Sequence, residues 1–231
     1  MAVSEVIEKV RSKGYWDIRI RPASFAADRL SRYELPKLLR GAVVRFRGWP
    51  VPFIDDRAQF VEGEDWIGQD IDAEVVSHYE AWRFFTSGQF TQLRSVSADW
   101  RVGAERTRIP SGFSSVVEVW EILFFLTEVY ELAARLALSP AGDDRMVIDT
   151  TLVGTSQRAL IVGQTARGEF AEPYRAHQNK VGFGFVVPRD ALVADASFQA
   201  AEAALTIFEQ FGWRPTLEQL QAHQEELTYG R

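Results

Sequence analysis

The sequence contains no cysteine and only three histidines among its 231 residues. The absence of cysteine excludes disulfides and thiolate metal sites, and it fits a protein of a reducing compartment. The histidines are far apart in the sequence, so they form no local zinc motif. The N-terminal segment MAVSEVIEKVRSKG lacks the apolar core of a secretory signal, and a cytoplasmic location is therefore the expectation.

The familiar catalytic motifs are also missing. There is no G-x-S-x-G elbow, Walker loop, G-x-G-x-x-G turn or H-E-x-x-H helix. The closest approach to a glycine-rich loop, VGFGFVVP, leads into a proline rather than a helix start, so we interpret it as a strand and not as a phosphate-binding loop. The sequence favours a non-catalytic protein without a cofactor.

The composition is that of an ordinary soluble domain, with 46% hydrophobic and 25% charged residues. The net charge of −6 is unevenly distributed, because the first 50 residues hold eleven Lys and Arg against five Asp and Glu. This asymmetry indicates either an anionic partner for the N-terminal part or an attraction between the two parts of the chain.

The hydrophobic periodicity predicts an α+β fold, with a mixed or antiparallel sheet packed on a long central helix. We expect residues 1–195 to form the α+β domain and residues 196–231 to form a C-terminal helical segment that packs on it. Helices are predicted at 4–13, 31–40, 113–138, 196–211 and 216–227. Strands are predicted at 15–22, 43–47, 146–154, 158–163 and 180–188, with 146–154 paired to 158–163 and a hairpin over 78–97 that turns at Ser87, Gly88 and Gln89.

The predicted helix 113–138 is apolar around most of its circumference. Its charged residues are expected to form one solvated stripe, made of Glu118, Glu121, Glu128, Glu131 and Arg135. Four glutamates within the segment argue against a membrane span, so we interpret it as the helix at the centre of the core.

The two N-terminal strands predict a cationic surface. If 15–22 and 43–47 lie side by side in one sheet, their alternation places four guanidinium groups on one face: Arg19, Arg21, Arg45 and Arg47. Such a cluster needs an anionic ligand or nearby carboxylates. The segment 55–74, with eight acids and one base, makes internal ion pairs the alternative.

Other candidate binding residues are aromatic or lie in polar loops. Trp49 and Trp82 are near turns, where aromatic side chains serve as apolar anchors at interfaces or as core residues. His177 belongs to the polar loop EPYRAHQNK and is either a site residue or a solvated histidine. The acidic stretch 62–74 is either a Mg²⁺ site or a hydrated loop.

Several stretches resemble a known family. IRIRP, RFRGWPVP, EAWRFFTSGQF and EVWEILFFLTEVYELAARLAL are similar to the region that accompanies the Schlafen AlbA-type DNA-binding domain in bacterial proteins. The resemblance spans roughly residues 15–165 and is most specific at Arg47-Gly48-Trp49 with Pro52 and at Trp82-Arg83 with Ser87-Gly88-Gln89-Phe90. The AlbA-type domain itself is expected to be absent, so the resemblance implies an accessory or sensor-like module and no catalytic residue.

These observations lead to three hypotheses. The first is a non-catalytic interaction or sensor module of a bacterial regulatory or defence assembly, with a protein partner. The second is direct nucleic-acid binding through the four arginines, with a steep salt dependence. The third is a metal-dependent hydrolase that uses the acidic stretch 62–74. No membrane association is expected, and the oligomeric state is left open.

Overall fold

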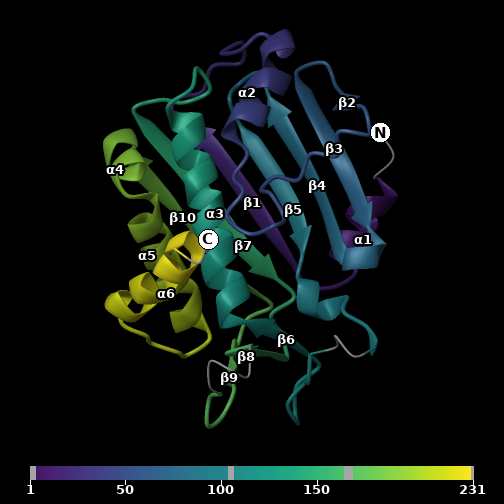
Figure 1. Cartoon of the computed structure of the whole chain (residues 1–231), viewed down its shortest axis with the longest axis vertical. Helices are drawn as coiled ribbons and strands as arrows, with labels where there is room; N and C mark the ends of the chain where they lie inside the picture. The colour runs from purple at the N-terminus through teal and green to yellow at the C-terminus, as the bar shows by residue number, and fades with distance from the viewer. Residues whose placement is uncertain (1–3, 104–106, 164–168, 230–231) are drawn as a thin grey trace.

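The structure, a computed structural model, describes residues 4–103, 107–163 and 169–229, with the backbone alone for 226–229. Its largest element is a seven-stranded antiparallel sheet in the order β10-β7-β1-β5-β4-β3-β2 (Figure 1). The strands are β1 (Tyr15–Pro22), β2 (Val61–Glu62), β3 (Trp66–Ala73), β4 (His78–Phe85), β5 (Phe90–Ser95), β7 (Arg145–Val153) and β10 (Lys180–Pro188).

The helices cover both faces of this sheet. They are α1 (Glu5–Arg11), α2 (Leu35–Ala42), α3 (Val119–Ala137), α4 (Arg189–Ala194), α5 (Ala196–Gln210) and α6 (Leu217–Tyr229), with short 3-10 turns η1 (Arg32–Glu34), η2 (Glu74–Val76) and η3 (Ser97–Asp99). In Figure 1, α3 crosses in front of the sheet, and α4, α5 and α6 lie beside it over β7 and β10. We call the sheet face toward α3 the inner face. Helix α1 packs against the outer face at β3, β4 and β5.

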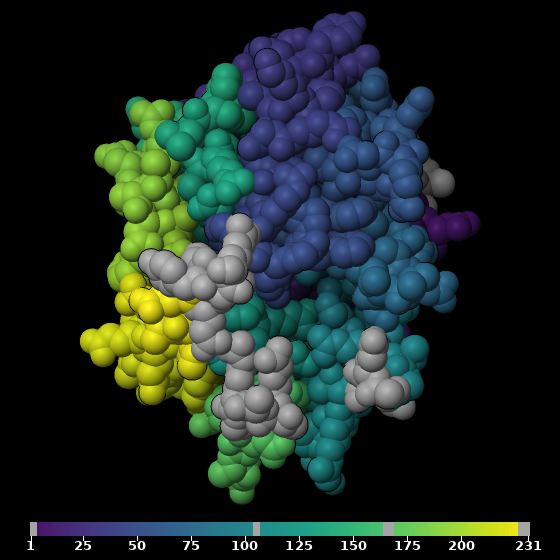
Figure 2. Space-filling model, in the orientation of Figure 1, coloured from purple at the N-terminus to yellow at the C-terminus, as the bar shows by residue number. Residues whose placement is uncertain are grey.

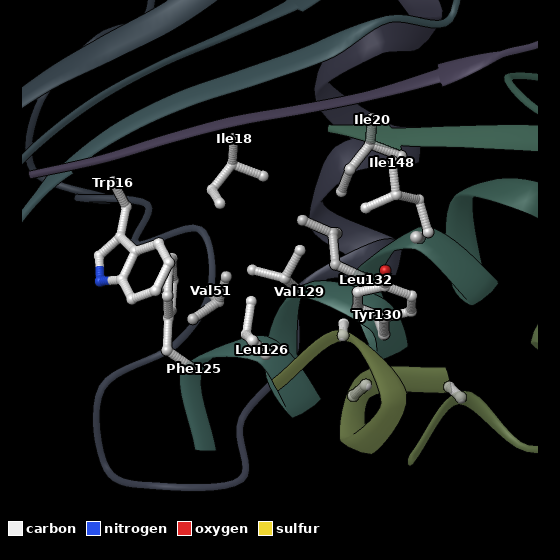
Figure 3. Packing of buried hydrophobic residues seen from close by; sticks show 14 of the residues in the cluster. Trp16, Ile18, Ile20, Val51, Phe125, Leu126, Val129, Tyr130, Leu132 and Ile148 are labelled. Atoms are coloured by element: carbon white, nitrogen blue, oxygen red, sulfur yellow. The ribbon is translucent and has the colours of Figure 1, made fainter. Parts of the chain in front are cut away.

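The core lies between α3 and the inner face. On β1 the alternation expected from the sequence is observed, because Trp16, Ile18 and Ile20 are buried. Figure 3 shows Ile18, Ile20 and Ile148 pointing toward side chains of α3, including Val129 and Leu132. With 19 residues, α3 is about 28 Å long, and its apolar side chains fill the space above β1 and β7.

A smaller three-stranded sheet lies at one end of the large one. It consists of β6 (Ser115–Glu118), β8 (Arg158–Ile161) and β9 (Tyr174–Arg175), in the order β6-β8-β9. Strands β6 and β8 are parallel, and β6 runs directly into α3 at Glu118.

The α+β class predicted from the sequence is confirmed, and so are several elements. Strand β1, the hairpin β4–β5 with Gly88 at a positive φ of 84°, and helix α5 match their predicted ranges closely. The C-terminal helices pack on the core: Gln224 of α6 donates a hydrogen bond of 2.8 Å from Nε2 to Oγ1 of Thr127 on α3. Within the described residues, none of the helices combines the length and the apolar character that a bilayer span requires.

The predicted strand 43–47 is wrong. The segment 43–60 folds over the inner face as an irregular loop, and its only described β-bridge joins Val44 to Val51. Both Val43 and Val44 are buried, which breaks the alternation of a half-buried strand. Figure 2 shows this blue segment on the central surface, below the violet residues that include α2. Local alternation had no means of revealing that the segment pairs with itself rather than with β1.

Three other predictions need correction. Strands β7 and β8 do not pair, because β7 lies between β1 and β10 while β8 joins the small sheet. The central helix begins at Val119, since residues 115–118 form β6. Helix α4 follows Pro188 directly, although we expected no helix start there; proline is compatible with the start of a helix because the first N–H groups have no partner in the helix.

Candidate functional site

The four arginines predicted to share a surface are dispersed. Arg19 and Arg21 lie on the outer face of β1, and the exposed guanidinium of Arg19 pairs with Asp17 at 3.1 Å. Arg45 is exposed on the loop, whereas Arg47 turns to the inner side of the sheet. The predicted common cationic face is therefore not formed, because the second strand that would have aligned these residues does not exist.

Arg47 instead binds a glutamate of α3. Its Nε donates to Oε1 of Glu128 at 3.1 Å and its Nη2 donates to Oε2, so the pair is bidentate. The Glu128 side chain is 0% exposed. The prediction that Glu118, Glu121 and Glu128 belong to a solvated stripe is wrong, because all three are buried. This side of α3 faces the part of the sheet that the segment 43–60 covers.

That part of the inner face is polar. We call the buried side chains that β3, β4 and β5 present there the polar half of the sheet: Gln69, His78, Glu80, Gln92 and Arg94. Their positions follow from period two and from the register, which aligns Arg94 with Glu80 and Gln92 with Trp82. The remaining inner face, on β1 and β7, is the apolar half: Ile18, Ile20, Met146, Ile148 and Leu152.

The polar half binds the segment 43–60 through specific hydrogen bonds. Nε1 of Trp49 donates to Nε2 of His78 at 2.8 Å, and the Trp49 ring stacks on Phe53 with centroids 4.3 Å apart. Glu80 accepts from the backbone N–H of Phe53 at 2.8 Å, and its other oxygen is 2.7 Å from His78 Nε2. Burial lowers the pKa of His78, although Glu80 opposes this shift. The loop is thus fixed to the sheet by polar contacts.

Trp82 is part of the same arrangement. It is fully buried, and its Nε1 donates to the backbone oxygen of Phe53 at 2.8 Å. The amide of Gln69 binds the backbone of Asp55 and Ala58 at 3.0–3.1 Å. Arg47, Trp49 and Trp82, three of the predicted binding residues, therefore gather here as the supports of a loop. None of them forms the exposed anchor expected from the sequence.

Two charged groups of this region lack full partners. Nη1 of Arg94 and Oε2 of Glu121 are buried without a hydrogen bond, and the Arg94 guanidinium lies 4.5 Å from the ring centroid of Phe125. Burial lowers the pKa of Arg94, and Arg47 lowers it further. Burial raises the pKa of Glu121, against the hydrogen bond of 3.0 Å that Oε1 accepts from the Ser97 N–H.

The acidic stretch 62–74 forms ion pairs with bases elsewhere in the chain. Asp70 pairs with Arg83 at 2.7 Å and Asp72 pairs with Lys9 at 2.9 Å. Among the residues that the structure describes, no group of three or more His, Asp or Glu could hold a metal ion. His177 is exposed between β9 and β10, away from the other predicted residues.

A polar pocket of about 700 Å³ opens where the two sheets meet. Five stretches of the chain line it: residues 12–14, 98–103, 107–109, 114–116 and 154–158. Among the described residues, the lining includes three cationic side chains, one carboxylate and several hydroxyl groups: Lys13, Arg101 and Arg158, Asp99, and Ser12, Thr107, Ser114, Ser115 and Ser156. A second carboxylate, that of Glu118, pairs with Arg101.

A buried ion pair forms the rigid wall of this pocket. Arg158 is 2% exposed and binds Asp99 in a bidentate manner, with N–O distances of 2.8 and 2.6 Å. Arg158 also donates to the backbone oxygens of Val116 and Gly154. Gly14 is required beside it, because a Cβ at this position would lie 2.1 Å from Arg158 Nη2. These contacts join the two sheets.

The other two cations are more accessible. Lys13 is exposed, with Nζ donating to the backbone oxygen of Asp99 at 2.8 Å and lying 3.8 Å from the centroid of the Trp100 ring. Arg101 donates from Nη1 to Thr107 Oγ1 at 3.0 Å and pairs with Glu118. An ammonium has three donors and a guanidinium has five, so both groups keep donors for an anionic ligand.

Sequence reasoning missed this pocket. Its charged residues belong to segments up to 145 residues apart and match no local motif. The only local signal is that Arg158 opens the apolar run RALIV, where a buried arginine requires a partner.

The comparisons with known proteins add nothing to this geometry: no family model, no curated protein and no solved structure matches the chain. The resemblance noted in the sequence therefore stays a prediction.

Proposed function

We propose that this chain is a non-catalytic binding module of the sensor type, and that it recognises an anionic group in the polar pocket between the two sheets. The observation that carries the proposal is that the described groups of the pocket include three cations against the carboxylates of Asp99 and Glu118, together with a hydroxyl lining. The sequence resemblance adds that the module would serve in a regulatory or defence assembly.

The three cations differ in accessibility, and this difference supports the recognition of an anionic ligand. Arg158 already donates four hydrogen bonds, to Asp99 and to two backbone oxygens, so we assign it to holding the walls together rather than to contacting the ligand. Lys13 and Arg101 stand at the accessible side, and charge-assisted hydrogen bonds from such groups are stronger than neutral ones. A phosphate or carboxylate group fits these donors.

The test is calorimetric titration of the full chain with inorganic pyrophosphate and with citrate. We expect binding of at least one probe, and about tenfold weaker binding by Lys13→Gln, because one hydrogen bond to a charged group contributes about 1.5–3 kcal/mol and 1.4 kcal/mol is tenfold. Arg19→Gln is the matched control. It removes an exposed cation that lies on the outer face and pairs only locally with Asp17.

Two outcomes would contradict the proposal. One is the absence of binding for both probes by the wild-type chain. The other is an equal loss of affinity in Lys13→Gln and Arg19→Gln, since a general charge effect and not the pocket would then explain binding.

The anionic group can belong to a small molecule or to nucleic acid, and the salt dependence distinguishes them. A short single-stranded oligonucleotide is titrated at about 50 mM and about 200 mM salt. Tight binding that falls steeply over this range and depends on Lys13 favours the phosphodiester backbone as ligand. Binding of pyrophosphate without oligonucleotide binding favours a small molecule.

A further inference from the structure

Among the residues that the structure describes, no strand pairs with the outer edge of β10. Antiparallel pairing directs the backbone groups of alternate residues toward the same neighbour. The N–H and C=O of Gly182 both bind the side-chain amide of Gln210, at 3.1 and 3.3 Å, so they point away from β7. The backbone groups of Gly184 and Val186 therefore point outward in the same direction.

The side chains of β10 lack the charges that usually prevent another strand from pairing with a sheet edge. Between Lys180 and Arg189 the strand reads VGFGFVVP, without a charge, and Val186 is 58% exposed. Edge strands that remain unpaired are commonly protected by charged side chains. The opposite edge is protected in this way. The short β2 pairs only with Ile67 and Gly68, and the part of β3 that it leaves unpaired carries Asp70 and Asp72.

A groove runs beside the open part of β10. Its volume is about 320 Å³, and it lies between the edge strand and one face of α5. The strand contributes residues 185–188, and the helix contributes residues three to four positions apart, as expected for a single helical face: Gln199, Glu202, Leu205 and Thr206. Leu217, at the start of α6, also lines the groove.

We propose that this groove takes an extended peptide segment of a partner protein, which adds to the sheet as a strand beside β10. The peptide backbone would pair with Gly184 and Val186, and its alternate side chains would enter the groove between Phe185 and α5. An edge strand flanked by a helix supplies both requirements of strand addition: main-chain hydrogen bonds for affinity and a pocket for alternate side chains. Only a short part of β10 is available for backbone pairing, because the Gln210 side chain already binds the backbone of Gly182 and Pro188 has no N–H.

The groove also defines the chemistry of the peptide. Glu202 is exposed and is the one charged side chain among the described lining residues, while Phe185, Val187 and Leu205 make most of the groove surface apolar. The fitting segment therefore carries apolar residues at alternate positions and one lysine or arginine opposite Glu202. It has no proline where it must donate to β10.

A second copy of the chain is a poorer occupant than a peptide. Two copies joined along β10 by a two-fold axis perpendicular to the sheet would bring both α5 helices to the same face at the joint. A groove of about 320 Å³ accommodates only a few side chains. The site shares no lining residue with the polar pocket, so its test is independent of the proposed function.

The experiment selects a random-peptide display library on the immobilised full chain and then measures the affinity of the enriched peptides. Val186→Pro removes an outward N–H that the fold does not use, and proline is tolerated at such edge positions. We expect it to weaken binding about tenfold or more, through the lost hydrogen bond and the bulk of the ring. Val186→Thr, the matched control, keeps the N–H and the branched shape, and should bind like the wild type.

Two further measurements make the result specific. Amide hydrogen exchange of Gly184 and Val186 should slow when an enriched peptide is added, whereas Phe185, already bonded to β7, serves as the internal reference. Selection on Glu202→Lys should enrich acidic peptides in place of basic ones. The proposal is overturned if no peptide is enriched, if the Gly184 and Val186 amides stay unprotected, or if the chain forms a dimer that Val186→Pro dissociates.

Discussion

The apolar half and the polar half of the inner face are each covered by another part of the chain, but different interactions hold the covering element in place. In the apolar half, Ile18, Ile20 and Ile148 pack against α3 by shape and burial alone (Figure 3). In the polar half, the covering element is the irregular segment 43–60. Its backbone donates a hydrogen bond to Glu80 and accepts hydrogen bonds from Gln69.

The difference follows from the backbone of the covering element. A helix satisfies its own N–H and C=O groups, so the sheet beneath α3 needs only apolar side chains. An irregular segment leaves backbone groups unpaired, and burying them without partners is costly. The polar side chains of β3, β4 and β5 supply those partners, which explains why buried charged residues and a loop occur together.

The largest effect is expected in the apolar half. Ile148→Ala should lower the free energy of unfolding by about 2–5 kcal/mol, because it leaves a cavity at a fully buried position of the core. Chemical denaturation provides the measurement. Ile148→Val should cost only about 0.5–1.5 kcal/mol, and equal costs for the two variants would show that packing is not what stabilises this half.

A smaller loss of stability, which a second substitution can offset, is expected in the polar half. Glu128→Ala should cost about 1–3 kcal/mol, because it leaves the guanidinium of Arg47, itself partly solvent-exposed, without its partner. The double variant Arg47→Met with Glu128→Leu should recover most of this loss, since replacing both members of a buried pair by apolar residues is often nearly neutral.

Denaturation of the wild type, of Arg47→Met alone, of Glu128→Leu alone and of the double variant gives the coupling free energy of the pair. If the double variant is no more stable than Glu128→Ala, the pair acts through more than its mutual attraction. No second substitution is expected to restore the stability lost in Ile148→Ala in this way. This contrast distinguishes the apolar packing of one half from the paired charges of the other.

The smallest effect concerns pH. Burial raises the pKa of Glu121 in the folded chain above its unfolded value, so the folded state binds more protons between the two values. The free energy of unfolding should therefore fall as the pH rises from the unfolded pKa through the folded one. Glu121→Gln keeps an acceptor for the Ser97 N–H and lacks this titration.

The stability of Glu121→Gln relative to the wild type should accordingly increase with pH and then level off. Denaturation of both chains between about pH 4 and about pH 8 tests this, because the difference cancels the groups they share. A difference that stays constant over the range would mean that Glu121 titrates normally in the folded chain.

Local sequence patterns predicted the elements that depend on neighbouring residues alone. The alternation of Trp16, Ile18 and Ile20 and the turn at Gly88 were sufficient for β1 and for the hairpin β4–β5. They were insufficient for the segment 43–60, whose Arg47 is positioned by a glutamate 81 residues away. The polar pocket escaped prediction for the same reason, since Arg158 and Asp99 meet only in the folded chain.

The direct passage of β6 into α3 ties the polar pocket mechanically to the centre of the molecule. Val116 lines the pocket, and Val119 already begins the helix, so no flexible connection separates the two. We therefore expect that any displacement of β6 would move the first turn of α3 with it, since there is no intervening loop to absorb the change.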